Sequence, residues 1–160
     1  IVESTFTIPK NQLPEAYERM CALNARDDLK RGGERSPKAD AFTAAERARL
    51  GYHPYKWFSW MDANYPASCA DAQAVFEALG FEVTVDDGYL SLNAYDNKTG
   101  QEAAFLAAVS DLATGFIVWQ GEDGRRWRET YGGEAVMVAT AMPAWGDPQP
   151  RTLATMGPYD

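Results

Sequence analysis

Apolar and polar residues follow two different repeats along this chain, and the change from one repeat to the other predicts its first elements. Residues 4–8 alternate between polar and apolar and stop at Pro9, a pattern typical of a short strand. Leu13, Tyr17 and Met20 then recur every three to four positions, which predicts an amphipathic helix of about three turns. The chain therefore begins with a strand followed by a helix.

Two further helices are predicted by apolar stripes that lie between helix-starting and helix-ending residues. The first has a capping box at Ser68 and Asp71, a stop at Gly80, and a stripe at Ala72, Val75, Phe76 and Leu79. The second has a box at Thr99 and Glu102, a stop at Gly115, and a stripe at Phe105, Val109 and Leu112. Both helices have an apolar side that a sheet could cover.

Alternating segments around these helices predict five strands in two groups. Residues 81–85 and 89–95 form a hairpin, because Asp86, Asp87 and Gly88 between them are turn residues. A meander follows the last helix, with strands at residues 116–120, 125–131 and 134–140. The strands are therefore expected to pair with their sequence neighbours.

The order of these elements predicts a single α+β domain over residues 1–160. A strand, a helix, a hairpin, a helix and another strand form the split β-α-β arrangement of ferredoxin-like folds. We expect an antiparallel sheet with helices on one face, an N-terminal helical insertion and an extra C-terminal β-hairpin. Residues 25–66 form the loop and helix insertion, with a helix at residues 41–50. Residues 143–160 are expected to be an irregular tail, since they contain four of the nine prolines.

Composition and charge narrow the class of protein. Hydrophobic residues make up 46% and charged residues 24%, which is typical of a globular domain, and no apolar run is long enough to cross a bilayer. The formal net charge is −8: residues 1–50 carry nine bases and eight acids, and residues 51–160 carry six bases and fifteen acids. Such a body repels nucleic acid and anionic lipid and favours a basic partner, although the same charge also serves solubility. Without a signal segment, we expect a cytoplasmic location.

The residues proposed to meet a basic partner are acidic side chains in or beside the expected turns, together with aromatic anchors. The acidic patch is predicted to comprise Asp86, Asp87, Asp96, Glu122 and Asp123. The anchors Tyr55, Trp57 and Trp60 come from an aromatic segment at residues 52–65, which serves either as core or as interface.

Candidate chemistry is sparse in this sequence. His53 is the only histidine, and Cys69 lies next to the start of an expected helix, where the helix dipole lowers the pKa of a thiol. A pocket near His53 and Cys69 would make the chain a small-molecule enzyme or ligand-binding protein, which is the alternative hypothesis. The two cysteines and one histidine match no metal motif, and no phosphate-binding loop is present, so we expect no cofactor and no metal.

Three segments carry a resemblance to a known group of proteins. Residues 57–61, 74–83 and 116–124, the last followed by Trp127 and Arg128, resemble small accessory proteins of phages and mobile elements. The resemblance covers about residues 55–140 and implies a setting in which many proteins inhibit host defence, anti-CRISPR proteins among them. The leading hypothesis is therefore a non-enzymatic, phage-encoded inhibitor in the host cytoplasm, which binds a basic, nucleic-acid-handling host protein.

Overall fold

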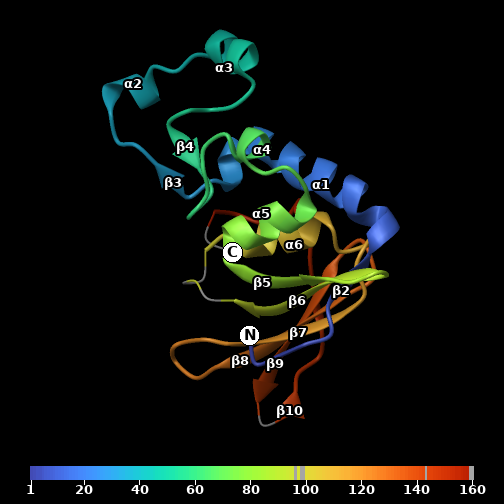
Figure 1. The fold of residues 1–160 in the computed structure, drawn as a ribbon. Helices are drawn as coiled ribbons and strands as arrows, with labels where there is room; N and C mark the ends of the chain where they lie inside the picture. Colours follow the sequence, from blue (N-terminus) through green and yellow to red (C-terminus); the bar gives the residue numbers. More distant parts are fainter. Residues whose placement is uncertain (96, 98–99, 143, 159–160) are drawn as a thin grey trace.

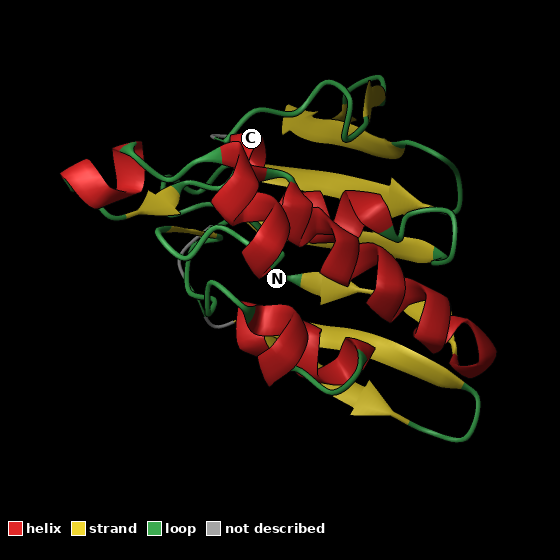
Figure 2. Ribbon diagram, turned by 90° about the horizontal axis from the view of Figure 1, so that it is seen from above, coloured by secondary structure: helices red, strands yellow, loops and turns green. Residues whose placement is uncertain are grey.

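The computed structural model describes residues 1–95, 97, 100–142 and 144–158, and the fold is α+β with antiparallel sheets. Helices cover one face of the strands, as Figure 2 shows from above. In the part of the chain that the structure describes, no helix has both the length and the apolar character needed to span a membrane.

The N-terminal segment joins two groups of strands. β1 (Glu3–Ser4) pairs antiparallel with β7 (Gly115–Gln120), and β2 (Thr7–Pro9) pairs antiparallel with β6 (Tyr89–Tyr95). A bridge between Thr7 and Thr114 continues the register of β1 with β7, so residues 3–9 run as one strand between β6 and β7. β5 (Phe81–Val85) pairs on the far side of β6, as the predicted hairpin requires. β6 and β7 consequently run in the same direction.

The C-terminal strands extend the sheet beyond β7. β8 (Arg126–Tyr131) pairs with β7, and β9 (Val136–Met142) pairs with β8. The segment expected to be an irregular tail departs from the prediction, because β10 (Ala144–Trp145) and β11 (Gln149–Arg151) both pair with β9. Backbone pairing of these residues does not depend on an alternating side-chain pattern, which is why the sequence did not reveal it.

Three helices supply the other half of the core. α1 (Leu13–Ala22), α5 (Ala72–Leu79) and α6 (Glu102–Ala108) pack over the strands (Figure 1). All seven residues of α6 are buried, as expected of a short helix with covered sides. The fully buried side chains from strands and helices form one cluster, which includes Phe6, Ile8, Met20, Phe76, Phe105 and Ile117.

Helix ends show where local signals hold and where they fail. Gly80 ends α5 at a φ of 106°, as predicted. The predicted cap at Ser68 is wrong, because Asp71 is the N-cap and its side chain accepts a hydrogen bond from the Ala74 N–H at 2.8 Å. Ser68 instead ends the short helix α4 (Tyr65–Ser68). The predicted cap at Thr99 lies outside the described residues.

The insertion forms an arm that projects from the helical side (Figure 1). Its stem pairs β3 (Gly32–Gly33) with β4 (Lys56–Trp57), and its end carries α2 (Pro37–Asp40) and α3 (Ala44–Leu50). Three 3-10 turns, η1 (Lys10–Gln12), η2 (Leu23–Ala25) and η3 (Asp27–Leu29), flank α1 and lead into this stem. A Cβ atom on Gly32 would lie 2.3 Å from the Trp57 ring, so the stem requires glycine there.

Candidate functional site

The predicted acidic patch is divided between the two ends of the sheet. Since β6 and β7 run in the same direction, the turn before β6 and the turn after β7 lie at opposite ends (Figure 1). Asp86 and Asp87 occupy the first turn, and Glu122 and Asp123 occupy the second. Asp96 lies outside the described residues. The prediction of one patch from all five is therefore wrong, because strand order decides which turns are neighbours.

A stretch of sequence without lysine or arginine nevertheless forms one border of the sheet. Residues 57–97 contain seven aspartates and glutamates and neither lysine nor arginine. They form α4, α5, β5 and β6, and α5 packs on β5, which is the outermost strand of its group. We define the acidic edge as four exposed residues on or beside β5: Glu77, Glu82, Asp86 and Asp87.

Hydrogen bonds keep the turn of the acidic edge in shape and keep Asp86 charged. The Asp86 carboxylate accepts hydrogen bonds from the backbone N–H groups of Gly88 at 2.8 Å and Tyr89 at 2.9 Å. These two bonds lower the pKa of Asp86, and the charge of Lys10 lowers it further. The Lys10 N–H also donates to the Gly88 carbonyl at 2.9 Å, so the backbone of this base is tied to the turn.

The other end of the sheet carries a hollow of about 680 Å³. Its walls are aromatic, with Tyr95 from β6, Trp119 from β7 and Trp127 from β8. Trp119 and Trp127 form a cross-strand aromatic pair, in which the rings stack with centroids 6.1 Å apart and an interplanar angle of 13°. Glu122 and Asp123 therefore belong to the rim of an aromatic hollow rather than to the acidic edge.

The three predicted aromatic anchors have different surroundings. Tyr55 is half-buried and packs against Phe42 and His53 at the base of the arm. Trp57 is half-buried against Gly32. Trp60 is 57% exposed and has a φ of 71°, a left-handed conformation that side chains this large rarely adopt. Trp60 is thus the predicted anchor that a partner could reach, while Tyr55 and Trp57 hold the arm together.

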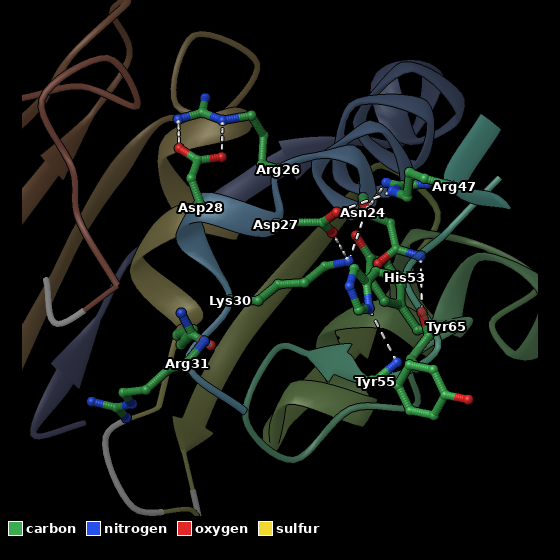
Figure 3. Close-up of polar contacts among 12 residues, drawn as sticks. Asn24, Arg26, Asp27, Asp28, Lys30, Arg31, Arg47, His53, Tyr55 and Tyr65 are labelled. Atoms are coloured by element: carbon green, nitrogen blue, oxygen red, sulfur yellow. Dashed lines mark hydrogen bonds and ion pairs between the residues drawn. The ribbon is translucent and has the colours of Figure 1, made fainter. Parts of the chain in front are cut away.

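Charged side chains dock the arm onto the end of α1 (Figure 3). Lys30 Nζ donates to the Asn24 carbonyl at 2.8 Å and to Asp27 Oδ1 at 2.7 Å. Arg47 from α3 donates to the same Asn24 carbonyl at 2.9 Å and to Asp27 Oδ2 at 3.0 Å. One carboxylate and one carbonyl thus bind two cations that are seventeen positions apart in the chain.

Burial and charge have opposite effects on the pKa values in this cluster. Burial alone would raise the pKa of Asp27, but the hydrogen bonds and charges of Lys30 and Arg47 outweigh it and lower that pKa. Burial lowers the pKa of Lys30, whose side chain is fully covered, and the contact with Asp27 opposes this shift. The cluster is a satisfied ion network of the kind that joins two structural elements.

His53 and Cys69 have separate environments. His53 Nδ1 accepts a hydrogen bond from the Tyr55 N–H at 3.2 Å, and burial lowers its pKa. It lines a shallow hollow of about 380 Å³ together with Asp27, Phe42 and Arg47. Cys69 lies between α4 and α5, its carbonyl accepts a hydrogen bond from Tyr17 Oη, and burial raises the pKa of its thiol. Burial therefore opposes the thiolate that a nucleophilic cysteine needs.

Two buried polar residues that organise the chain were not predicted from the sequence. Gln101 joins α6 to the arm: its Oε1 accepts hydrogen bonds from the N–H groups of Arg31 at 2.7 Å and Ser59 at 3.2 Å. Its Nε2 donates to the Leu29 carbonyl. Glu129 on β8 is 3% exposed and binds Arg151. Gln101 lies between Gly100 and Glu102, and Glu129 lies between Arg128 and Thr130, so the immediate sequence neighbours do not indicate burial.

Neither comparison with known proteins nor a search for metal ligands assigns a function to this chain. No protein-family model, curated protein or solved structure matches this chain. Within the described ranges, no group of three histidine, cysteine, aspartate or glutamate side chains is arranged to hold a metal ion. Function is therefore inferred from the surface and from the hollow.

Proposed function

We propose that this chain is a non-enzymatic binding protein that engages a basic partner through the acidic edge. The observation that carries the proposal is the base-free stretch at residues 57–97, which folds onto one border of the sheet. In the setting that the resemblance implies, the partner is a nucleic-acid-handling host protein, and the chain acts as a phage-encoded inhibitor in the host cytoplasm. Covering a basic surface would block its access to nucleic acid.

Electrostatics and the strand edge both support this binding mode. Four exposed carboxylates near one strand attract a basic surface and accelerate its association, an effect that falls as salt screens the charges. β5 is also the last strand of its group, so one side of its backbone is available to a partner. The same carboxylates discourage pairing between two copies of β5, since like charges would meet.

We also infer that the fold is an elaborated ferredoxin-like arrangement. Support comes from the spatial order β7, the strand at residues 3–9, β6 and β5, with every neighbouring pair antiparallel. α1 and α5 precede β5 in the chain, and α6 connects β6 to β7, as the split β-α-β connection requires. In this description the arm is an insertion after α1, and β8 to β11 are an extension beyond β7.

The experiment compares two double variants with the same change of charge. Glu82→Lys with Asp87→Lys reverses the acidic edge, and Glu3→Lys with Glu122→Lys reverses two exposed acids on the β1–β7 side. Each protein is immobilised and exposed to host lysate at about 50 and 300 mM salt, where screening differs. We expect a basic protein to be retained at low salt by the wild type and the β1–β7 variant, and lost from the acidic-edge variant. Equal retention by both variants would refute the acidic edge.

A further inference from the structure

The hollow at the ends of β6 and β7 and the start of β8 has the construction of a ligand site. Its volume of about 680 Å³ falls in the range of pockets that hold small organic molecules. Tyr95, Trp119 and Trp127 provide its aromatic walls, and Ile1 and Val138 add apolar surface. It lies at the opposite end of the sheet from Asp86 and Asp87, so it is independent of the proposed function.

Buried carboxylates fix the aromatic walls in place. Tyr95 Oη donates to Glu102 Oε2 at 3.2 Å, and Trp127 Nε1 donates to Glu129 Oε1 at 3.3 Å. Glu102 is 7% and Glu129 3% exposed, so each ring is held from behind by an acid in the core. Trp119 packs edge-on against Tyr95 at 5.6 Å and stacks on Trp127. Walls that are fixed in this way need little reorganisation when a ligand binds.

One polar group in these walls has no partner. Trp119 Nε1 is buried, and no acceptor binds it in the described part of the chain. A buried donor without an acceptor costs free energy, of the order of 1–3 kcal/mol for groups of this kind. The Trp119 ring lines the hollow, but its Nε1 atom is itself covered.

The rim selects an uncharged ligand with many hydroxyl groups. Among the described side chains that line the hollow, Glu122 and Asp123 carry two negative charges and Arg125 and Arg126 carry two positive charges, whereas the chain as a whole carries −8. A phosphate-bearing ligand is therefore disfavoured by the surrounding field, and a purely apolar ligand would strip water from the rim without replacing its hydrogen bonds. A ring with an apolar face and hydroxyl edges satisfies both the walls and the rim.

We propose that this hollow binds a neutral saccharide, with one sugar face against the Trp127 ring and its hydroxyl groups toward the rim formed by Glu122, Asp123, Arg125 and Arg126. The carboxylates accept hydrogen bonds from the hydroxyl groups, and the guanidinium groups donate to them. The chain then has two separate surfaces, an acidic edge for a protein and a hollow for a saccharide.

The test uses the indole N–H resonances of the five tryptophans in a nitrogen-15 NMR titration. The probes are neutral tetrasaccharides built from glucose, mannose or N-acetylglucosamine, with adenosine monophosphate as the charged, planar competitor. The expected result is that one tetrasaccharide shifts the Trp119 and Trp127 signals and leaves those of Trp57, Trp60 and Trp145 unchanged. No shift with any tetrasaccharide, shifts confined to the other three tryptophans, or a response to the nucleotide alone would overturn the proposal.

A matched pair of variants locates the binding without disturbing the core. Thr140 is exposed, lines the hollow and is the cross-strand partner of Trp127, so Thr140→Phe fills the space. Thr130 is exposed on the other side of the sheet, and Thr130→Phe is the control. We expect the dissociation constant to rise at least about tenfold in Thr140→Phe and to stay within about twofold in Thr130→Phe. Equal affinity in both variants contradicts the site even if a saccharide binds.

Discussion

Arg151 Nη2 donates a hydrogen bond to Glu129 Oε1 at 2.7 Å and so ties the C-terminal segment to the interior of the sheet. The Glu129 side chain is only 4% exposed, and its other oxygen accepts a hydrogen bond from Tyr131 Oη at 2.7 Å. Because a buried carboxylate needs such partners, the C-terminal segment is an integral part of the fold. β11 also pairs with β9 through its backbone.

Removal of the Arg151 side chain is expected to destabilise the protein strongly. Arg151→Ala leaves the Glu129 charge buried without its cation, which costs about 3 kcal/mol of the free energy of unfolding. Urea denaturation at pH 7 measures this loss. Arg125→Ala is the control, because the Arg125–Asp123 pair is exposed and contributes less than about 1 kcal/mol. If both variants lose the same stability, the buried pair does not hold the segment.

The Gln101 side chain is expected to hold the arm against α6. Gln101→Ala removes the partners of the Arg31 and Ser59 N–H groups and of the Leu29 carbonyl, and we expect a loss of about 2 kcal/mol. Hydrogen exchange should accelerate at the amides of Arg31 and Ser59, while the amides of β7 stay protected in native-state exchange. Gln73→Ala is the matched control, because Gln73 bonds only an exposed Glu77 one helical turn away. Unchanged exchange at Arg31 and Ser59 would contradict this role.

The left-handed backbone at Trp60 predicts that this residue lowers the stability of the fold, while its exposed ring is open to contact. Trp60→Gly relieves the strain and Trp60→Ala retains it, so the glycine variant should be more stable than the alanine variant by about 1 kcal/mol. Both are measured by thermal and urea unfolding against the wild type. A glycine variant no more stable than the alanine variant would show that the φ of 71° is not strained.

Local sequence patterns were sufficient to predict those elements whose structure is determined by their own segment of the chain. The strands at residues 81–85 and 89–95 match the prediction, since alternation and the turn at Asp86 are local signals. The end of α5 at Gly80 matches for the same reason. The α+β class follows from the order of such elements and is confirmed.

Features that depend on distant partners could not be predicted from these patterns. The separation of Asp86 from Glu122 depends on the strand at residues 3–9 entering between β6 and β7, which no local pattern specifies. Gln101 lies next to Glu102 in an ordinary polar position, and its burial depends on the arm folding back over α6. Likewise, the hollow forms where the ends of β6 and β7 meet the start of β8, which are distant in the sequence.

The buried carboxyl group of Glu102 is expected to make the stability of the protein depend on pH. Burial raises the pKa of its carboxyl above the usual value, and hydrogen bonds from the Gly100 N–H and Tyr95 Oη only partly offset this effect. A raised pKa in the folded state means that the protonated form is favoured there. Glu102 therefore contributes its full stabilisation at pH values below its pKa in the unfolded chain. This stabilisation is lost as the pH rises through its pKa in the folded protein.

Replacement of Glu102 by glutamine removes the cost of ionising a buried acid while retaining an oxygen that accepts from the Gly100 N–H. We expect Glu102→Gln and the wild type to differ little near pH 4, and the variant to be more stable by about 1 kcal/mol at pH 7, where the wild-type carboxyl is ionised in the unfolded chain. Urea midpoints measured every half unit between pH 4 and pH 8 check this expectation. A variant that is less stable than the wild type at pH 7 would mean that the charged form of Glu102 is the one that the fold prefers.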